Sequence, residues 1–188
     1  MKKGVIVSFL VLLLMAPVYG AGKYTVSLTA NFLSPADGDY KDVYGSGVFF
    51  PELKLGYKIS GNFSLWGGLG LLSAEGSTPV LDEDSKSNQN FISFGAGYNK
   101  NLKEKLDFKF ELGLAYVNYR EEALGEKISD SAFGFKLDAG LLYTISNSFF
   151  AVVELSYLCA RDTLTFEGEE VKIKLGGLKG GIGVGVRF

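Results

Sequence analysis

Eight charged residues occupy alternating positions in segments that are otherwise apolar or built from small residues. Four are acidic and four are basic: Glu52, Glu111, Asp138, Glu154, Lys54, Lys109, Lys136 and Lys179. Three segments hold an acid and a base two residues apart, a spacing that places both on one face of a β-strand. Such a set could relay protons or ions, could supply a carboxylate pair for acid–base catalysis, or could form a structural network of salt bridges.

The residue types that most enzymes need are scarce. The chain has no histidine and a single cysteine, Cys159, so nucleophile–base arrangements, zinc sites and internal disulfides lack their components. The Gly-x-Gly pairs at Gly68, Gly95, Gly181 and Gly183 lie inside strand-like segments with no helix after them, unlike a phosphate-binding loop. We therefore expect no catalytic residue, cofactor or metal site. We interpret the charged set as an interlocked salt-bridge network, with an ion pathway as the alternative.

The elements that must position these charges are eight segments in which apolar residues alternate with polar or small ones. They are residues 24–32, 48–59, 63–73, 91–98, 107–116, 133–145, 149–159 and 178–188. In DFKFELGLAY, which begins at Asp107, every second residue is large and apolar, and this period of two predicts a β-strand with two unlike faces. Upstream of the last segment, Ile173 and Leu175 are in the opposite phase. We therefore expect a β-bulge at Gly176-Gly177.

The connections between these segments differ in length. Residues 60–62, 99–105 and 146–148 form short turns, whereas residues 34–47, 74–90, 120–131 and 161–170 form long polar loops. Short turns at one end and long loops at the other are typical of an outer-membrane β-barrel. We expect no helix of useful length.

The apolar faces must meet either lipid or a soluble core. Each segment carries an aromatic residue at or near the end closest to a short turn: Tyr24, Tyr57, Phe63, Tyr98, Phe108, Tyr143, Phe149 and Phe188. Eight aromatics at one height predict an interfacial girdle on the periplasmic side. The polar faces are rich in glycine and serine, which suits the narrow interior of an eight-stranded barrel. We expect lipid outside. A secreted soluble barrel of the lipocalin kind fits the alternation equally and is the alternative.

The N-terminus predicts export. Basic residues at Lys2 and Lys3 precede an apolar run from Val5 to Met15, and Pro17 and Gly20 complete the pattern of a signal peptide. The run is shorter than the ~20 apolar residues of a transmembrane helix. We expect a signal peptide at residues 1–20 and one domain at residues 21–188. Without the two lysines, 17 of the 19 basic residues face 21 acidic ones, a balance that argues against nucleic acid as a partner.

Three stretches carry a resemblance to a known family: GVGVRF at the C-terminus, GLGLLS, and PELKLGYKISGNFSLWGGLG. They resemble the small outer-membrane barrels of the OmpA/OmpX type. The resemblance implies an all-β fold, an eight-stranded antiparallel up-and-down transmembrane β-barrel in the cell outer membrane. It also implies that the terminal Phe188 is an assembly signal for the outer-membrane assembly machinery. Enzymes of the outer membrane commonly use histidine, so we expect this chain not to be an enzyme.

The long loops are the remaining candidates for function. They and the adjoining strand ends hold 15 of the 21 acidic residues and six basic ones. Asp82-Glu83-Asp84 and the cluster from Glu167 to Glu170 could share divalent cations with lipopolysaccharide, or could be solvated loop tips. Tyr40, Tyr44 and Phe166 are candidate contacts for a surface partner. We expect a structural or surface-interaction role: envelope stability, adhesion or lipopolysaccharide contact. The alternative is a narrow channel for small solutes or ions, and an enzyme acting on lipids is a third possibility.

Overall fold

The fold was analysed in a computed structural model that describes residues 22–78, 83–123, 125–166 and 169–188. The expected signal peptide at residues 1–20 lies outside the described residues, as do Asp82 and Glu167 of the acidic clusters. Among the residues described, no helix is both long enough and apolar enough to cross a membrane.

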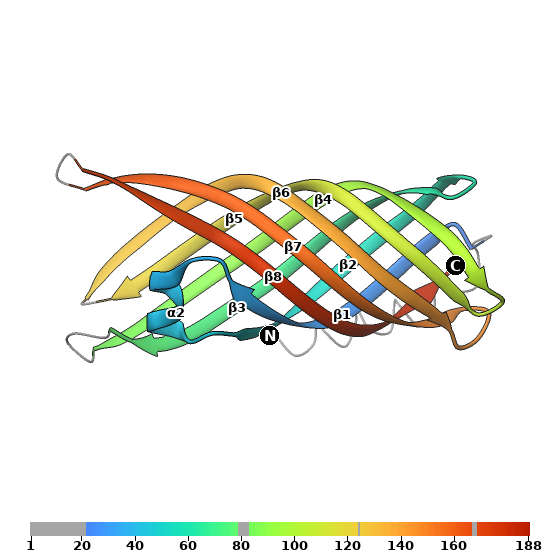
Figure 1. Cartoon of the computed structure of the whole chain (residues 1–188), viewed down its shortest axis with the longest axis horizontal. Helices are drawn as coiled ribbons and strands as arrows, with labels where there is room; N and C mark the ends of the chain where they lie inside the picture. Colours follow the sequence, from blue (N-terminus) through green and yellow to red (C-terminus); the bar gives the residue numbers. More distant parts are fainter. Residues whose placement is uncertain (1–21, 79–82, 124, 167–168) are drawn as a thin grey trace, which may run out of the picture.

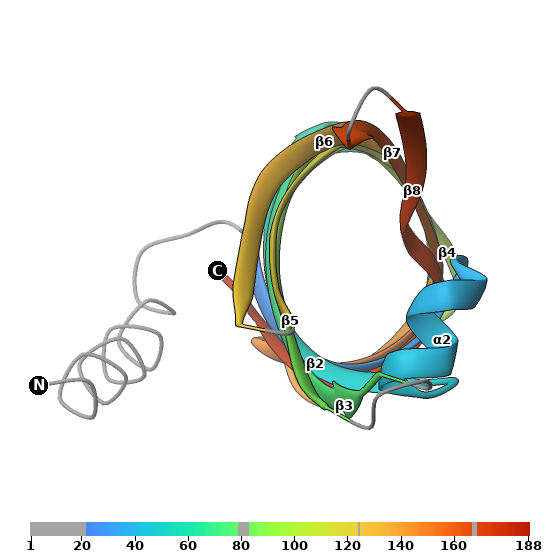
Figure 2. The same ribbon diagram turned by 90° about the vertical axis from the view of Figure 1, so that its left-hand side faces the viewer.

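Eight antiparallel strands close into one ring, as the sequence predicts (Figures 1 and 2). They are β1 (Tyr24–Pro35), β2 (Val48–Ser60), β3 (Phe63–Ser77), β4 (Asp84–Lys103), β5 (Leu106–Ala123), β6 (Glu126–Thr144), β7 (Phe149–Phe166) and β8 (Glu169–Arg187). Each strand pairs with its neighbours in sequence, and β1 pairs with β8 to close the barrel. The predicted all-β, up-and-down barrel is therefore confirmed.

The alternation along each strand separates an outer face from an inner one. The outer face is a band of exposed apolar side chains, among them Phe133 at 77%, Phe49 at 74% and Ile182 at 66% of full exposure. The inner face holds all eight charged residues of the candidate set, and each of them is buried. Burial of the charges and exposure of the apolar residues reverse the arrangement of a soluble barrel.

The strands extend well beyond the segments that the alternation predicts. Most of the expected loop 74–90 is paired strand, because β3 and β4 remain in register as far as Ser77 and Asp84. The same is true of 120–131 and 161–170, where hairpins β5–β6 and β7–β8 continue. These long hairpins project from one end of the barrel, which we call the hairpin end (left in Figure 1). The expectation of long irregular loops is therefore wrong there, because backbone pairing continues past the last apolar outward residues.

A short helix lies at the hairpin end, where the sequence predicted only a loop. Helix α2 (Gly38–Tyr44) begins at Asp37, whose carboxylate accepts hydrogen bonds from the backbone N–H groups of Asp39 and Tyr40. This is a conventional N-cap. Figure 2 shows α2 at the rim of the ring.

The expected bulge at Gly176-Gly177 is also not found. Pairing between β7 and β8 runs without a shift from Phe149↔Val186 to Phe166↔Glu169. The phase change has another cause: Leu175 is buried inside the barrel, and Ile173 is partly buried against the same interior cluster. Both residues occupy the inner face because the interior becomes apolar at this height. Both glycines nevertheless have positive φ angles, 93° and 149°, which glycine adopts at little cost.

The structure places the predicted girdle residues on the outer surface at the end with short turns. Six of the eight are exposed, and Phe108 and Phe188 are half-buried. Tyr24 packs against Tyr57 and Phe188, with ring centroids 5.0 and 5.9 Å apart. A second group of outward aromatics, which the sequence analysis did not single out, lies toward the hairpin end. Its members are Phe32, Phe49, Tyr116 and Phe133.

Candidate functional site

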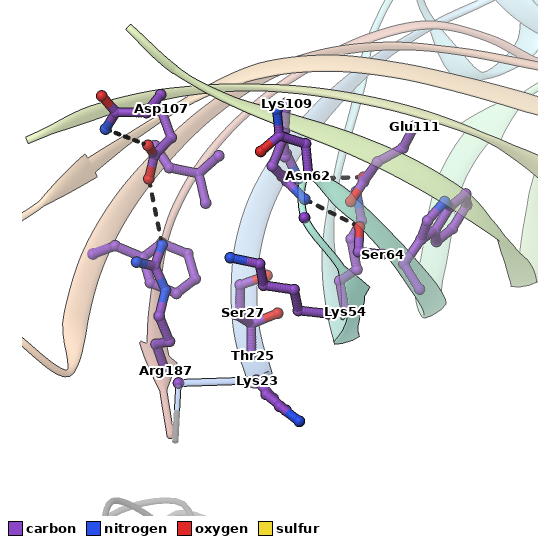
Figure 3. Close-up of a pocket in the computed structure, with 18 residues that line it drawn as sticks. Lys23, Thr25, Ser27, Lys54, Asn62, Ser64, Asp107, Lys109, Glu111 and Arg187 are labelled. Atoms are coloured by element: carbon purple, nitrogen blue, oxygen red, sulfur yellow. Dashed lines mark hydrogen bonds and ion pairs between the residues drawn. The ribbon is translucent and has the colours of Figure 1, made fainter. Parts of the chain in front are cut away.

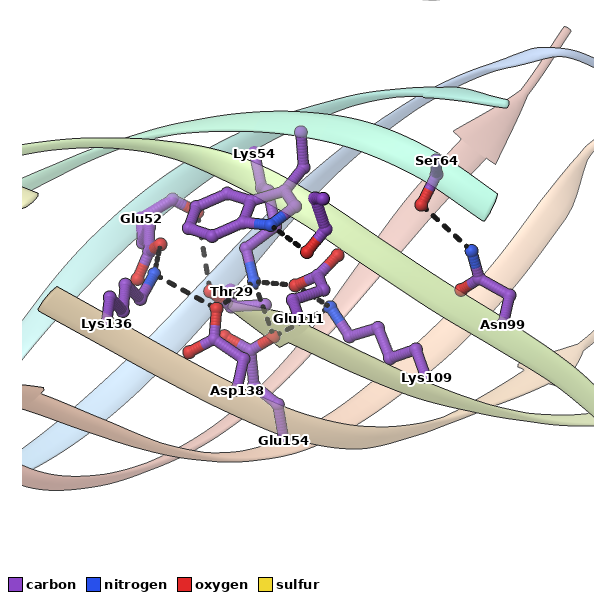
Figure 4. A network of polar contacts seen from close by, with 12 residues as sticks. Thr29, Glu52, Lys54, Ser64, Asn99, Lys109, Glu111, Lys136, Asp138 and Glu154 are labelled. Carbon is purple, nitrogen blue, oxygen red and sulfur yellow. Dashed lines mark hydrogen bonds and ion pairs between the residues drawn. The ribbon is translucent and has the colours of Figure 1, made fainter. Parts of the chain in front are cut away.

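The charged residues inside the barrel come from five strands and meet across the lumen. Strands β2, β5 and β6 contribute two each, and β7 and β8 contribute Glu154 and Lys179. Their exposed fractions range from 0% for Asp138 to 7% for Glu111. We call these eight residues the charged level, and Figure 4 labels all of them except Lys179.

Lys54 is the centre of the charged level. Its ammonium lies 2.8 Å from Glu111, 2.9 Å from Asp138 and 3.2 Å from Glu154, and so joins carboxylates from three other strands. Lys109 bridges two of the same groups, at 3.3 Å from Glu111 and 3.0 Å from Glu154. These contacts link β2 to the opposite wall of the barrel.

Glu52 organises the other half of the charged level. It accepts hydrogen bonds from Lys136 and Lys179, one on each carboxylate oxygen. Lys136 also lies 3.4 Å from Asp138, and Lys179 lies 3.9 Å from Glu154. Every ammonium of the set is thus within 4.0 Å of at least two carboxylates, and every carboxylate is near at least two ammoniums.

The pairing differs in one detail from the spacing along the sequence. Lys109 and Glu111 are in contact, as are Lys136 and Asp138. Glu52 and Lys54 are not partners, because each reaches across the lumen to other strands. A shared face along one strand therefore predicts two of the three pairs, but it does not identify the partners of Glu52 and Lys54 across the lumen.

Trp66 covers the charged level, and the alternation in the sequence did not identify it as a functional residue. It is 4% exposed, and its indole N–H donates to the carbonyl of Ala96 at 3.1 Å. The ammoniums of Lys54 and Lys136 lie 5.3 and 5.2 Å from the ring centroid, within the range of cation–π attraction. A single tryptophan on the polar face, followed by Gly67 and Gly68, was the available signal.

Glycines on the inner face make room for these side chains. A Cβ atom at Gly113 would meet the Trp66 ring at 2.7 Å, and one at Gly68 would meet the Glu52 carboxylate at 3.0 Å. The small residues that the sequence shows on this face are therefore needed for packing, as expected for a filled eight-stranded barrel.

Above the charged level, toward the hairpin end, the interior is largely apolar, although Ser87 and Gln89 are also buried there. We call this part the apolar level, and it comprises Leu33, Val48, Phe50, Leu72, Ala74, Phe91, Ala115, Val117, Tyr119, Ala132, Leu158, Ala160 and Leu175. None of these side chains is more than 8% exposed. The alternation predicted a polar inner face along each strand. This expectation is wrong toward the hairpin end of the barrel, where the apolar level lies. Phe50 and Leu72 follow Phe49 and Leu71 directly in the sequence, which conceals the alternation.

Helix α2 packs against the apolar level. The rings of Tyr40 and Tyr44 lie 4.5 Å apart, and the Tyr44 hydroxyl donates to the Glu121 carboxylate at 2.6 Å. Ser87 donates to the second oxygen of Glu121, also at 2.6 Å. Burial raises the pKa of Tyr40 to about 12 and that of Tyr44 well above its usual range. Tyr40 and Tyr44, the candidate contacts for a surface partner, thus also anchor the helix to the barrel.

Below the charged level, a cavity of about 250 Å³ opens at the short-turn end (Figure 3). Its polar walls include Ser64, Asn99 and Asp107, and Arg187 lies 3.5 Å from Asp107. Lys54, Lys109 and Glu111 also line the cavity. The cavity therefore meets the charged level at these three residues, and the apolar level lies beyond them.

Comparison with known proteins agrees with this architecture. Over residues 5–188 the chain matches a family profile described as "Outer membrane protein beta-barrel domain". No curated protein sequence matches the chain. Among solved structures, the chain is similar to the outer membrane protein OprG from Pseudomonas aeruginosa, with 11% identity and a TM-score of 0.67. That match covers 90% of this chain and 97% of OprG.

Two further structures share the fold. The Escherichia coli outer membrane protein W is 12% identical, with a TM-score of 0.60 and coverage of 91% of this chain and 100% of that one. Neisserial surface protein A is 15% identical, with a TM-score of 0.57 and coverage of 90% and 100%. At these identities the structures report on the fold alone. The family profile spans nearly the whole sequence, and the chain therefore belongs to the outer membrane protein beta-barrel domain family, with its apolar band in the outer membrane.

Proposed function

We propose that this protein is a closed outer-membrane scaffold that does not conduct ions and that acts through its cell-surface hairpins and outer face. Its role is structural or interactive: envelope stability, adhesion or contact with lipopolysaccharide. The observation that carries the proposal is the filled lumen, in which the charged level and the apolar level succeed one another along the axis. Nothing in this proposal requires a catalytic group.

Two features of the lumen argue against the alternative of a narrow channel. A permeating ion would have to displace ammonium–carboxylate contacts of 2.8 to 3.4 Å. It would then have to cross the apolar level, whose packed side chains are almost all hydrocarbon and cannot replace its hydration shell. Both steps are costly, and they follow one another on the same path.

Single-channel recording tests the proposal directly. The full chain, purified from outer membranes and inserted into a planar bilayer in 1 M KCl, should show no stable conducting state. The triple variant Phe50→Ala/Leu72→Ala/Lys54→Ala, which thins both levels, serves as the positive control and should conduct. Stable openings of the wild-type protein would contradict the closed scaffold and favour the channel.

We further propose that Phe188 is read by the outer-membrane assembly machinery, as the resemblance implies. The Phe188 backbone exchanges hydrogen bonds with Tyr24, at 2.8 and 3.0 Å, and joins the last residue of the chain to the first strand. If Phe188 acts during assembly, Phe188→Ala should lower the amount of folded protein in cells. The same variant should refold normally in detergent. Equal losses in both settings would assign Phe188 a purely structural role.

A further inference from the structure

The outward faces of the extracellular hairpins carry two different arrangements of charge. Strands β3 to β6 present a row of alternating sign: Glu75, Lys86, Glu122 and Lys127 stand opposite one another in register. Lys86 lies 3.0 Å from Glu75, and Lys127 lies 3.3 Å from Glu122. Arg120 also pairs with Glu122, at 3.0 Å. On this side each of these cations has a carboxylate partner on the protein itself.

The β7–β8 hairpin differs, because its outward cations have no such carboxylate partners among the described residues. Arg161 on β7 stands directly opposite Lys174 on β8, and Lys172 stands opposite Thr163. All three cations are exposed, while their neighbours in sequence Asp162 and Ile173 face the interior. Like charges directly opposite each other on antiparallel strands are destabilising. The hairpin therefore holds a repulsive pair in the native structure.

The nearby carboxylates do not neutralise this pair. Asp37 caps α2 and accepts a hydrogen bond from the backbone N–H of Lys174, at 3.2 Å. Asp162 points inward and accepts from the Tyr119 hydroxyl at 2.8 Å. Glu170 faces outward but lies farther along the hairpin than Lys172. Within the described residues, none of the three cations forms an ion pair within 4.0 Å.

The position of these three cations along the barrel axis indicates which part of the membrane could supply a group that offsets their repulsion. Arg161 follows Cys159, the next outward residue below it, and Tyr157 and Leu178 are outward, exposed apolar residues of the lipid-facing band. At the corresponding edge of β4, β5 and β6 the first polar row is neutral, namely Asn90, Asn118 and Ser131. The cations therefore stand at the boundary between the acyl chains and the headgroups of the outer leaflet, on one side of the barrel only.

We infer that the outward face of the β7–β8 hairpin, formed by Arg161, Lys172 and Lys174, binds the phosphate groups of lipopolysaccharide in the outer leaflet. Arginine presents a planar donor fork that fits phosphate, and lysine adds a mobile point charge. A phosphate between Arg161 and Lys174 would convert their repulsion into two attractive contacts. This inference deepens the proposed surface role and moves lipopolysaccharide contact from the acidic loop tips to a basic face near the membrane.

Lipid binding by purified protein tests the inference. The full chain in detergent micelles, free of divalent cations, is titrated with lipid A that carries two phosphates and with the same lipid after removal of both. Arg161→Gln/Lys174→Gln should bind the phosphorylated lipid at least tenfold more weakly than wild type. Lys86→Gln/Lys127→Gln loses the same total charge from the β3–β6 row and should stay within twofold. Heat-modifiable gel mobility confirms that each variant is folded.

Three outcomes of this titration would overturn the inference. Equal losses in the two double variants would mean that binding follows net charge alone. Equal binding of both lipids by the wild type would mean that acyl chains, not phosphates, are recognised. Displacement of the lipid by inorganic phosphate at the same phosphate concentration would identify a site for a soluble anion.

A charge reversal gives an independent readout. Lys174→Glu replaces the repulsive pair with an attractive one, so the variant should melt at a higher temperature than wild type in lipid-free detergent. Phosphorylated lipid A should raise the melting temperature of the wild type but not of the variant. A variant that is no more stable and is still stabilised by the lipid would refute the inference. Conductance tests the closed scaffold and lipid binding tests this site, so failure of either is recognisable.

Discussion

The two levels of the lumen fill the same cylinder with opposite chemistry. The charged level depends on mutual neutralisation, since Lys54 touches three carboxylates and Glu52 accepts from two lysines. The apolar level is a packed hydrophobic cluster with α2 against it. The comparison teaches that an eight-stranded barrel can be filled in either way. The chemistry of each level decides which substitutions it tolerates: charge changes are costly in the first, and volume changes in the second.

Removing the central ammonium should have the largest effect. Lys54→Met keeps much of the side-chain volume but leaves three buried carboxylates short of a partner, which should lower the free energy of unfolding by about 3–5 kcal/mol. Urea unfolding in lipid vesicles measures the change. Lys58→Met, four residues along the same strand at an exposed position, is the matched control. Equal stability of both variants would contradict the interlocked network, and partial rescue by Lys54→Met/Glu111→Gln would support it.

A cavity in the apolar level should rank second. Leu72→Ala removes a side chain that is 3% exposed, and the cost of such a substitution is about 2–4 kcal/mol. The adjacent Leu71, 51% exposed, faces outward, so Leu71→Ala should cost less than Leu72→Ala, because it loses contact with lipid but leaves no cavity in the interior. The same unfolding assay applies. Similar losses at both positions would mean that the apolar level is not tightly packed.

Added volume at the boundary of the two levels should have an intermediate effect. Gly113→Ala would press a methyl group against the backbone carbonyl of Phe94 and against the Trp66 ring, and overpacking of this kind costs about 1–3 kcal/mol. Trp66 is the only tryptophan of the chain, so its fluorescence reports the displacement as well. Gly180→Ala provides the control, because no heavy atom lies within 4 Å of a Cβ atom built there. An unchanged Trp66 spectrum in Gly113→Ala would indicate that the added methyl group does not displace the ring.

Alkaline pH should have the smallest effect, through the buried tyrosines at the hairpin end. An unfolded tyrosine ionises near pH 10.0, whereas burial raises the pKa of Tyr40 to about 12. In the folded state, Tyr40 therefore keeps its hydroxyl proton to a higher pH than in the unfolded state. The stability contributed by Tyr40 is complete below pH 10 and falls as the pH rises toward 12. Tyrosinate absorbance should show a late-ionising component that is smaller in Tyr40→Phe/Tyr44→Phe, while Tyr119, whose pKa burial also raises, remains part of it. A wild-type titration without this component would argue against the docked helix.

The strand order, the lipid-facing side and the membership of the charged set were all predictable from the sequence. Each depends on a period of two, which is a local property. The ends of the strands were not predictable, because past Leu71 and Tyr116 the outward residues become polar while pairing continues. The anchoring of Tyr44 by Glu121, 77 positions away, was hidden for a different reason. No local pattern connects two residues so far apart.

By itself the sequence determined that this chain forms a closed barrel with its apolar side outward and its charges inward, because alternation fixes the face on which each side chain lies. Only the tertiary structure decided which charges meet, where the interior changes from ionic to apolar, and that Arg161 stands opposite Lys174. These features depend on the stagger between neighbouring strands and on distances across the lumen. Both are set when the ring closes and all eight strands are in register.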